Sequence, residues 1–177
     1  EHNEKYLFNK NIKNFEMIPG NPIAYNARNN IKKIFSDAKL LSEIDTPVIG
    51  VASHNDKYFL KLWYEIDFNK LGLGMKNRED AKKSLKKWFP INKGGNYKKW
   101  YGNNDYVVNY YNDGQEIKEF PEGQTKNQEK YFKEGITWSR ISSSNFGVRY
   151  HGNGFVMGDA GPSAFAPSKE LMYILAL

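Results

Sequence analysis

A cluster of cationic and aromatic side chains at residues 93–103 has the composition of a nucleic-acid contact. The stretch reads K-G-G-N-Y-K-K-W-Y-G-N, so three lysines are interleaved with three aromatic rings. Ammonium groups pair with phosphates, rings stack on bases or wedge between them, and an asparagine amide can bond to a base edge. The candidate phosphate contacts are Lys93, Lys98 and Lys99, and the candidate reading or wedging residues are Tyr97, Trp100, Tyr101 and Asn103.

A second candidate is the polar run R-I-S-S-S-N at residues 140–145. Hydroxyl, amide and guanidinium groups are the donors and acceptors that read base edges. Short polar residues also favour turns, so the alternative is a plain hairpin tip that contacts nothing. The candidates here are Arg140, Ser142, Ser143, Ser144 and Asn145. The flanking Trp138 and Phe146 are expected to belong to the core.

The positive charge of the chain is concentrated in one segment. The 177 residues carry a net charge of +6, while residues 76–99 alone hold nine basic and two acidic residues, a net charge of +7. Such a concentration is the electrostatic footprint of phosphate binding. The lysines of residues 82–87 are equally well explained as the solvated face of a helix, so they form a weaker second tier.

Two helices are predicted to flank the strands that carry these candidates. One helix is expected from Pro22 to about Ser36, with Asn21 as its N-cap. The other is expected from Lys76 to Phe89, capped by Asn77 and ended by the proline at position 90.

The remaining pattern is that of short strands and turns. Strands are expected at residues 46–52, 106–111, 136–141 and 148–150, and a tight turn at residues 112–114 is expected to lead into a returning strand at 116–120. The prediction is one α+β domain over residues 1–177, with mostly antiparallel strands and a few flanking helices. Residues 1–14 read as a polar arm, and residues 168–177 as the start of a truncated helix in an excised domain.

Composition narrows the class of protein further. The chain has no cysteine and three scattered histidines, so the residues predict neither a disulfide framework nor a zinc site. No apolar run is long enough to span a membrane, and the N-terminus lacks a signal-peptide profile, so a soluble cytoplasmic protein without membrane contact is expected.

Four stretches in order carry a resemblance to a known family. They are I-P-G-N-P-I-A-Y at residues 18–25, G-V-A-S-H-N-D-K-Y-F-L-K-L-W at 50–63, K-G-G-N-Y-K-K-W-Y-G-N-N-D-Y-V-V-N at 93–109, and G-I-T-W-S-R-I-S-S-S-N-F-G-V-R-Y at 135–150. Together they resemble the target-recognition (specificity) region of large adenine-specific DNA methyltransferases. The resembled proteins are the BREX phage-defence (PglX-like) enzymes and the fused restriction-modification enzymes with a TaqI-like specificity domain.

The resemblance implies that the chain recognises double-stranded DNA for a catalytic methyltransferase domain that precedes it in the same parent chain. That domain would bind S-adenosylmethionine and methylate N6 of adenine. This chain is expected to be non-catalytic and to bind no cofactor, since Asn21-Pro22 lacks the rest of an N-P-P-Y tetrapeptide and the paired glycines are isolated.

Three alternatives remain. The triplet Glu116-Ile117-Lys118, with Asp105 or Asp113 upstream, is a faint magnesium-nuclease pattern. The basic and aromatic mixture also suits a module that binds single strands or RNA. A protein-interaction module is the third alternative.

Overall fold

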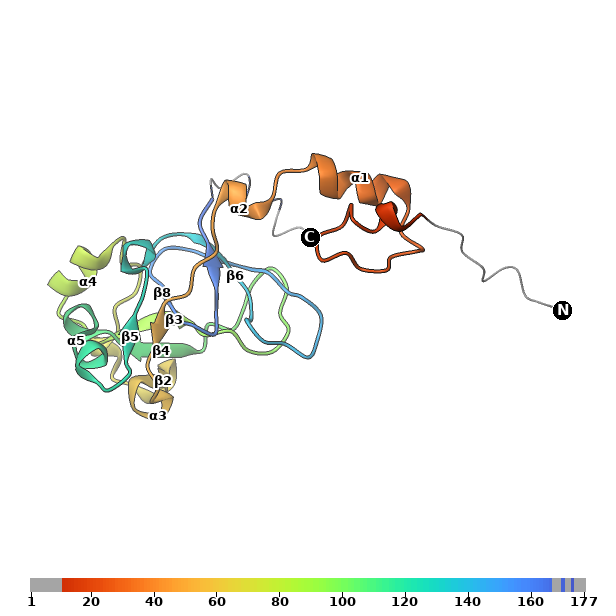
Figure 1. Cartoon of the computed structure of the whole chain (residues 1–177). Coiled ribbons are helices and arrows are strands. Elements are labelled where there is room, and N and C mark those ends of the chain that lie inside the picture. Colours follow the sequence, from red (N-terminus) through yellow and green to blue (C-terminus); the bar gives the residue numbers. More distant parts are fainter. Residues whose placement is uncertain (1–10, 167–169, 171–172, 174–177) are drawn as a thin grey trace. The chain divides into compact units, whose positions relative to one another are not determined.

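The computed structural model describes residues 11–166, Glu170 and Tyr173. The chain divides between Ile44 and Asp45 into two units, and each is described separately below (Figure 1). The prediction of one domain over residues 1–177 stays a prediction. The expected truncated helix at residues 168–177 and most of the expected polar arm at residues 1–14 lie outside the described residues.

The described part of the first unit, residues 11–44, contains three short helices, and the main one starts later than predicted. They are η2 (Ile12–Asn14), α1 (Asn29–Asp37) and α2 (Leu41–Ile44). The predicted start at Pro22 is wrong, because Asn21 has a φ of 47° and Pro22 leads into turns rather than into a helix. The N-cap of α1 is Arg28, which makes no side-chain capping bond.

The second unit is built on a four-stranded sheet with the order β2-β4-β3-β8. Its strands are β2 (Leu60–Leu62), β4 (Tyr106–Asn109), β3 (Trp88–Asn92) and β8 (Val156–Met157). The β2–β4 and β3–β4 pairs are antiparallel, and β3–β8 is parallel. Buried aromatic and aliphatic side chains pack on this sheet, among them Phe59, Phe89, Val108, Tyr110 and Phe132.

Two smaller sheets accompany the main sheet within residues 45–166. One has the order β7-β6-β9 and joins β7 (Arg149–His151), β6 (Gly135–Thr137) and β9 (Ser163–Ala164), all antiparallel. The other pairs β1 (Val51–Ala52) with β5 (Gln124–Thr125). The helices within residues 45–166 are short: α3 (Asp56–Phe59), η3 (Trp63–Glu65), η4 (Phe68–Lys70), α4 (Arg78–Lys83), α5 (Tyr111–Glu119) and η5 (Gln128–Lys130). The prediction of an α+β fold with mostly antiparallel strands is confirmed.

The helix predicted over residues 76–89 is half right. Asn77 caps it as expected, since its side chain accepts a hydrogen bond from the backbone N–H of Asp80 at 2.8 Å. The helix α4 nevertheless ends at Lys83, and Leu85 has a φ of 54°, which breaks the helical path. Trp88 and Phe89 belong instead to β3, where Phe89 is fully buried and pairs with Val108 of β4. Tertiary pairing therefore overrides the helical spacing of these apolar residues.

The predicted turn at residues 112–114 exists, but it does not lead into a hairpin. Asn112, Asp113 and Gly114 all have left-handed backbone angles, with φ between 46° and 75°. The chain then continues as a helical segment to Glu119, so the predicted returning strand at 116–120 is wrong. Ile117 is fully buried on this segment, which explains why the chain curls back onto the core.

The Asp113 carboxylate anchors this turn to α4. It accepts hydrogen bonds from Arg78 Nε at 2.8 Å, Lys118 Nζ at 2.9 Å and the Tyr110 hydroxyl at 3.0 Å. Burial alone would raise the pKa of Asp113, but the bonds from Arg78, Lys118 and Tyr110 outweigh it and hold that pKa well below its usual range.

Replacing Asp113 by Asn should lower the free energy of unfolding by about 2 kcal/mol, because it removes one charge of a part-buried ion pair while keeping a residue that tolerates left-handed angles. The stabilisation is present above the ordinary aspartate pKa near 4 and is lost as the pH falls below it, so the variant should also be less sensitive to acid. Urea unfolding at several pH values measures both effects. Asp37→Asn, which removes an exposed pair with Lys33, is the control and should change stability little.

Candidate nucleic-acid interface

The two candidate segments form neighbouring loops on the second unit. Loop 93–105 connects β3 to β4, and loop 138–148 connects β6 to β7. They project together on one side of the main sheet (Figure 1). Trp100 joins them through its backbone, since its N–H donates to the Val148 carbonyl at 2.9 Å and its carbonyl accepts from the Tyr150 N–H at 2.8 Å. Residues about fifty positions apart in the sequence are thereby brought side by side.

Close backbone approaches hold the two loops together at further points. The Ser139 hydroxyl donates to the Gly95 carbonyl at 2.8 Å. At Gly147 there is no room for a side chain, since a Cβ atom there would lie 2.5 Å from the Lys98 carbonyl oxygen and 3.0 Å from the Tyr97 ring. The glycine in the run N-F-G-V is thus explained by contact between the loops and not by a turn conformation.

Replacing Gly147 by Ala should separate the two loops. Because the obstructing atom belongs to the backbone of Lys98, the clash cannot be relieved by a rotamer change, and we expect a loss of about 1–3 kcal/mol in unfolding free energy. Gly152→Ala is the matched control, because a Cβ atom there has its nearest neighbour, the Tyr150 hydroxyl oxygen, at 4.0 Å. Urea unfolding of both variants checks this, and equal stability of the two would contradict the contact.

The predicted cations do not all have the same surroundings. Lys98 and Arg140 are exposed on the two loops, and the Lys99 ammonium lies 5.9 Å from the centroid of the Trp100 ring. These three cations, which we call the loop cations, therefore lie on adjoining loops.

Lys93, the remaining candidate cation, has an acidic partner. Its Nζ is 2.6 Å from the Asp56 carboxylate and 4.7 Å from the centroid of the Tyr106 ring. Burial raises the pKa of Asp56, but the bonds from Lys93 and Ser53 outweigh it, so the net pKa is lowered. A phosphate at Lys93 would have to compete with this carboxylate.

The aromatic candidates of loop 93–105 present their rings at the surface. Trp100 is 61% exposed and Tyr101 is 67% exposed, and Tyr97 is also exposed although it borders Gly147. Trp100 has a φ of 74°, an uncommon angle for a bulky residue, and it is held there by its two backbone bonds to the neighbouring chain. Exposed rings that are held in a fixed backbone can stack on bases.

Asn103 has an internal role in loop 93–105. Its side-chain Nδ2 donates to the Asn96 carbonyl at 2.9 Å, and its amide group faces Gly95. One of its donors is thus used within the loop, and its Oδ1 has no such bond among the described residues.

The polar tip, residues 142–145, is exposed throughout. The Ser142 hydroxyl accepts a hydrogen bond from the Ser144 N–H at 3.1 Å, which fixes the turn. Arg140 is fixed just before the tip by a bond from its backbone N–H to the Ala160 carbonyl at 3.0 Å. The antiparallel pairing of β6 with β7 confirms the expected hairpin, and the polar side chains of its serine-rich tip are exposed.

The expectation that both flanking aromatic residues lie in the core is right for one of them. Trp138 is half-buried and packs on the cluster of Ile136, Val148 and Ala164. Phe146 is 66% exposed, so its placement in the core was wrong. Ile141, expected to be part of a half-buried strand, is 88% exposed. Two large apolar side chains therefore frame the polar tip.

Sequence reasoning missed Arg149, which lies under loop 93–105. Arg149 is 2% exposed, and its backbone forms an isolated parallel β-bridge with that of Trp100. Its side-chain Nε has no hydrogen-bond partner among the described residues. Burial lowers the pKa of its guanidinium. The sequence could have pointed to Arg149 through its place in the alternation of a short strand, which directs it inward. Charged side chains rarely occupy such positions.

The second-tier lysines lie elsewhere. Lys82 and Lys83 lie on α4 and Lys86 and Lys87 follow it, and Figure 1 shows α4 on the side of the unit away from the two loops. Lys87 pairs with Glu116 at 3.8 Å, and Lys86 Nζ donates to the Asn69 carbonyl. These two contacts give Lys86 and Lys87 structural roles, and the weaker rank of the four lysines as phosphate contacts stays a prediction.

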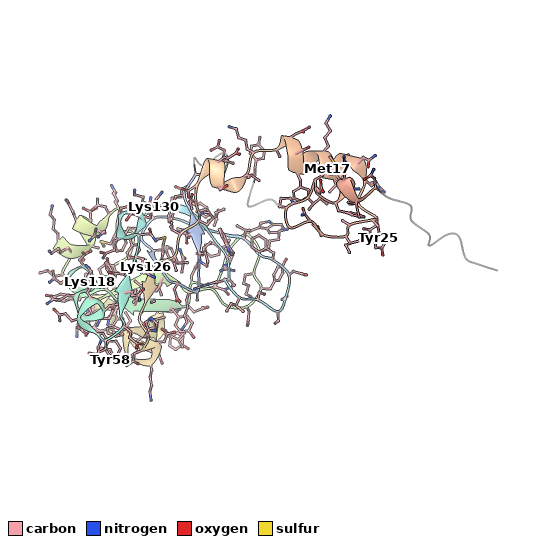
Figure 2. All side chains as sticks on the ribbon, viewed as in Figure 1. Met17, Tyr25, Tyr58, Lys118, Lys126 and Lys130 are labelled. Carbon is pink, nitrogen blue, oxygen red and sulfur yellow. The ribbon has the colours of Figure 1, made fainter. Side chains whose placement is uncertain are left out.

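The nuclease alternative gains no support from the arrangement of its residues. Glu116 accepts hydrogen bonds from Asn109 Nδ2 at 3.0 Å and from the Tyr58 hydroxyl at 3.2 Å, and Asp113 is held by Arg78. Figure 2 shows Tyr58 and Lys118 away from the two loops. Within the part of the chain that the structure describes, no three histidine, aspartate or glutamate side chains group as a metal site would require.

Across residues 11–166, Glu170 and Tyr173, no helix combines the length and apolar character needed to cross a bilayer.

No protein-family model matches the chain. The adenine-specific methyltransferase PglX of Lacticaseibacillus casei (strain Zhang) is 35% identical over 184 residues, which cover 98% of this chain and 15% of that protein. The adenine-specific methyltransferase BrxX of Escherichia coli O9:H4 (strain HS) is 35% identical over 175 residues, which cover 97% of this chain and 14% of that protein. Over nearly its whole length the chain is thus similar to one region of these adenine-specific methyltransferases, and it spans 14–15% of their length.

Proposed function

We propose that this chain is the DNA target-recognition part of an adenine-specific DNA methyltransferase in a phage-defence or restriction-modification system. The similarity to PglX and BrxX supports the methyltransferase context. The observation that carries the recognition role is the union of two distant segments into one exposed surface, joined by the backbone of Trp100. That surface combines cations, exposed rings and a polar tip, the three kinds of group that DNA readers use.

The work would be divided between this surface and the rest of the parent protein. The loop cations Lys98 and Lys99 would neutralise phosphates and set the position of the duplex. Arg140 and the polar tip would read base edges in a groove, while the rings of loop 93–105 would stack on or wedge between bases. Another part of the parent chain would hold S-adenosylmethionine, take the adenine out of the stack and methylate it. The fold would then be that of a methyltransferase specificity domain.

A direct experiment compares the ligands of the isolated chain. We expect it to bind double-stranded DNA, measured by fluorescence anisotropy at several salt concentrations, with an affinity that falls steeply as salt rises. We expect no binding of S-adenosylmethionine by calorimetry and no methyl incorporation, because the chain lacks both motifs. Binding of the cofactor, or no measurable affinity for any duplex, would contradict the proposal.

A second candidate function is supported by the exposure of Trp100 and Tyr101, since exposed rings on a basic loop also suit single strands. Competition decides between the two. Unlabelled single-stranded DNA or RNA and unlabelled duplex are compared as competitors of a labelled duplex. If the single strand displaces the labelled duplex at a lower concentration than the unlabelled duplex does, the single-strand role is favoured.

A further inference from the structure

The two apolar side chains beside the polar tip, those of Ile141 and Phe146, are largely exposed. Ile141 is the most exposed of the large apolar side chains in the described part of the chain, at 88%, and Phe146 on the other side of the tip is 66% exposed. Burying such a side chain contributes about 1.5–3 kcal/mol to folding, and neither residue makes that contribution. The folded core therefore gives no reason for an isoleucine and a phenylalanine at these positions.

Both residues are nevertheless held in place from behind. The ring centroid of Phe146 lies 6.1 Å from that of the half-buried Trp138. Ile141 directly follows Arg140, whose N–H is bonded to the Ala160 carbonyl, and it directly precedes the Ser142 turn. A β-branched side chain such as Ile141 also has few rotamers to lose. Exposed apolar groups on a fixed backbone can insert into a partner at low entropic cost.

The charges around these residues indicate which partner could accept them. Arg140 is exposed next to Ile141, and the other loop cations, Lys98 and Lys99, lie on the adjoining loop. Cations draw a DNA backbone to this face and disfavour a purely apolar protein surface. DNA-binding proteins insert isoleucine, leucine and phenylalanine between base steps, and removal of an adenine from the stack leaves a gap of suitable size.

We propose that Ile141, backed by Phe146, enters the base stack of the bound duplex at the position that the target adenine leaves. This inference rests on the proposed function, because it requires the duplex to lie against loop 138–148. Ile141 acts here as a positioning residue, since it fills the gap and hinders the return of the adenine without touching the reacting atoms.

The test uses the whole chain and two duplexes of the sequence that the parent enzyme methylates, as found by methylation-site sequencing. One duplex is intact, and the other carries an abasic site in place of the target adenine, so that the gap is already formed. We expect the unchanged chain to bind the abasic duplex about tenfold more tightly, because the unstacking of the adenine no longer opposes insertion. Ile141→Ser should bind both duplexes equally, Phe146→Ser should show a reduced preference, and Ile141→Met should retain most of it.

Leu73→Ser is the matched control, because it removes an exposed apolar side chain from outside the two loops. It should keep the full preference. An unchanged chain without any preference, or Ile141→Ser with the preference intact, would overturn the inference while leaving duplex recognition in place. Failure of the unchanged chain to bind the intact duplex would instead overturn the proposed function. The exposure of Ile141 means that its serine variant should unfold at the same urea concentration as the unchanged chain.

Discussion

We expect the double variant Lys98→Ala/Lys99→Ala to bind duplex DNA about thirtyfold more weakly than the unchanged chain at about 0.15 M salt, whatever the sequence of the duplex. Each phosphate contact contributes about 0.9 to the slope of log affinity against log salt, so the slope should become shallower by roughly 1.8. The preference for one sequence over another should survive, because phosphates carry no sequence information. Anisotropy titrations at four or more salt concentrations measure both quantities.

Two controls separate the position of these charges from their number. Lys82→Ala/Lys83→Ala removes the same charge from α4, which lies away from the two loops, and should change the slope little. Lys93→Ala should also leave the slope nearly unchanged, because its ammonium is already paired with Asp56. If the α4 variant flattens the slope as much as the loop variant does, phosphate binding is a property of the net charge and not of this surface.

The sequence predicted best those features that depend on local chemistry. Asn77 caps α4 because its side chain reaches a backbone N–H three residues on, a contact that neighbouring residues alone determine. The turn at residues 112–114 likewise follows from the tolerance of Asn, Asp and Gly for left-handed angles. The hairpin of residues 135–151 and the α+β class were predicted for the same reason.

The features that the sequence did not predict depend on distant partners. Trp88 and Phe89 continue a helical stripe, yet β4 supplies hydrogen bonds and a buried site that favour a strand. Ile141 was expected on a half-buried strand and Phe146 in the core because both are apolar, but the buried cluster of the small sheet consists of Ile136, Val148 and Ala164. No local pattern shows that loop 93–105 and loop 138–148 meet, since the contact depends on the backbone of Trp100 and the absence of a side chain at Gly147.

The polar tip should determine which sequence is bound, and not how strongly DNA is bound in general. Replacing Arg140 or Asn145 by Ala should cost roughly 1–3 kcal/mol on the preferred site, which corresponds to a loss of between about fivefold and about 150-fold in affinity. Affinity for unrelated duplexes and the salt slope should change little for Asn145→Ala, because no charge is removed. Arg140→Ala should add at most about 0.9 to the change in slope if the guanidinium also contacts a phosphate.

The measurement that separates reading from positioning combines the chain with its parent enzyme. Methylation-site sequencing of the parent carrying Asn145→Ala should show a relaxed site at one base position, while the salt-titrated binding of the chain itself keeps its slope. Asn69→Ala on η4 is the matched control, since it removes an exposed amide from outside the two loops and should alter neither result. A tip variant that loses the same affinity on every duplex would mean that the tip only shapes the loop. Its serines would then act through the turn that Ser142 and Ser144 form, and base reading would pass to the rings of loop 93–105.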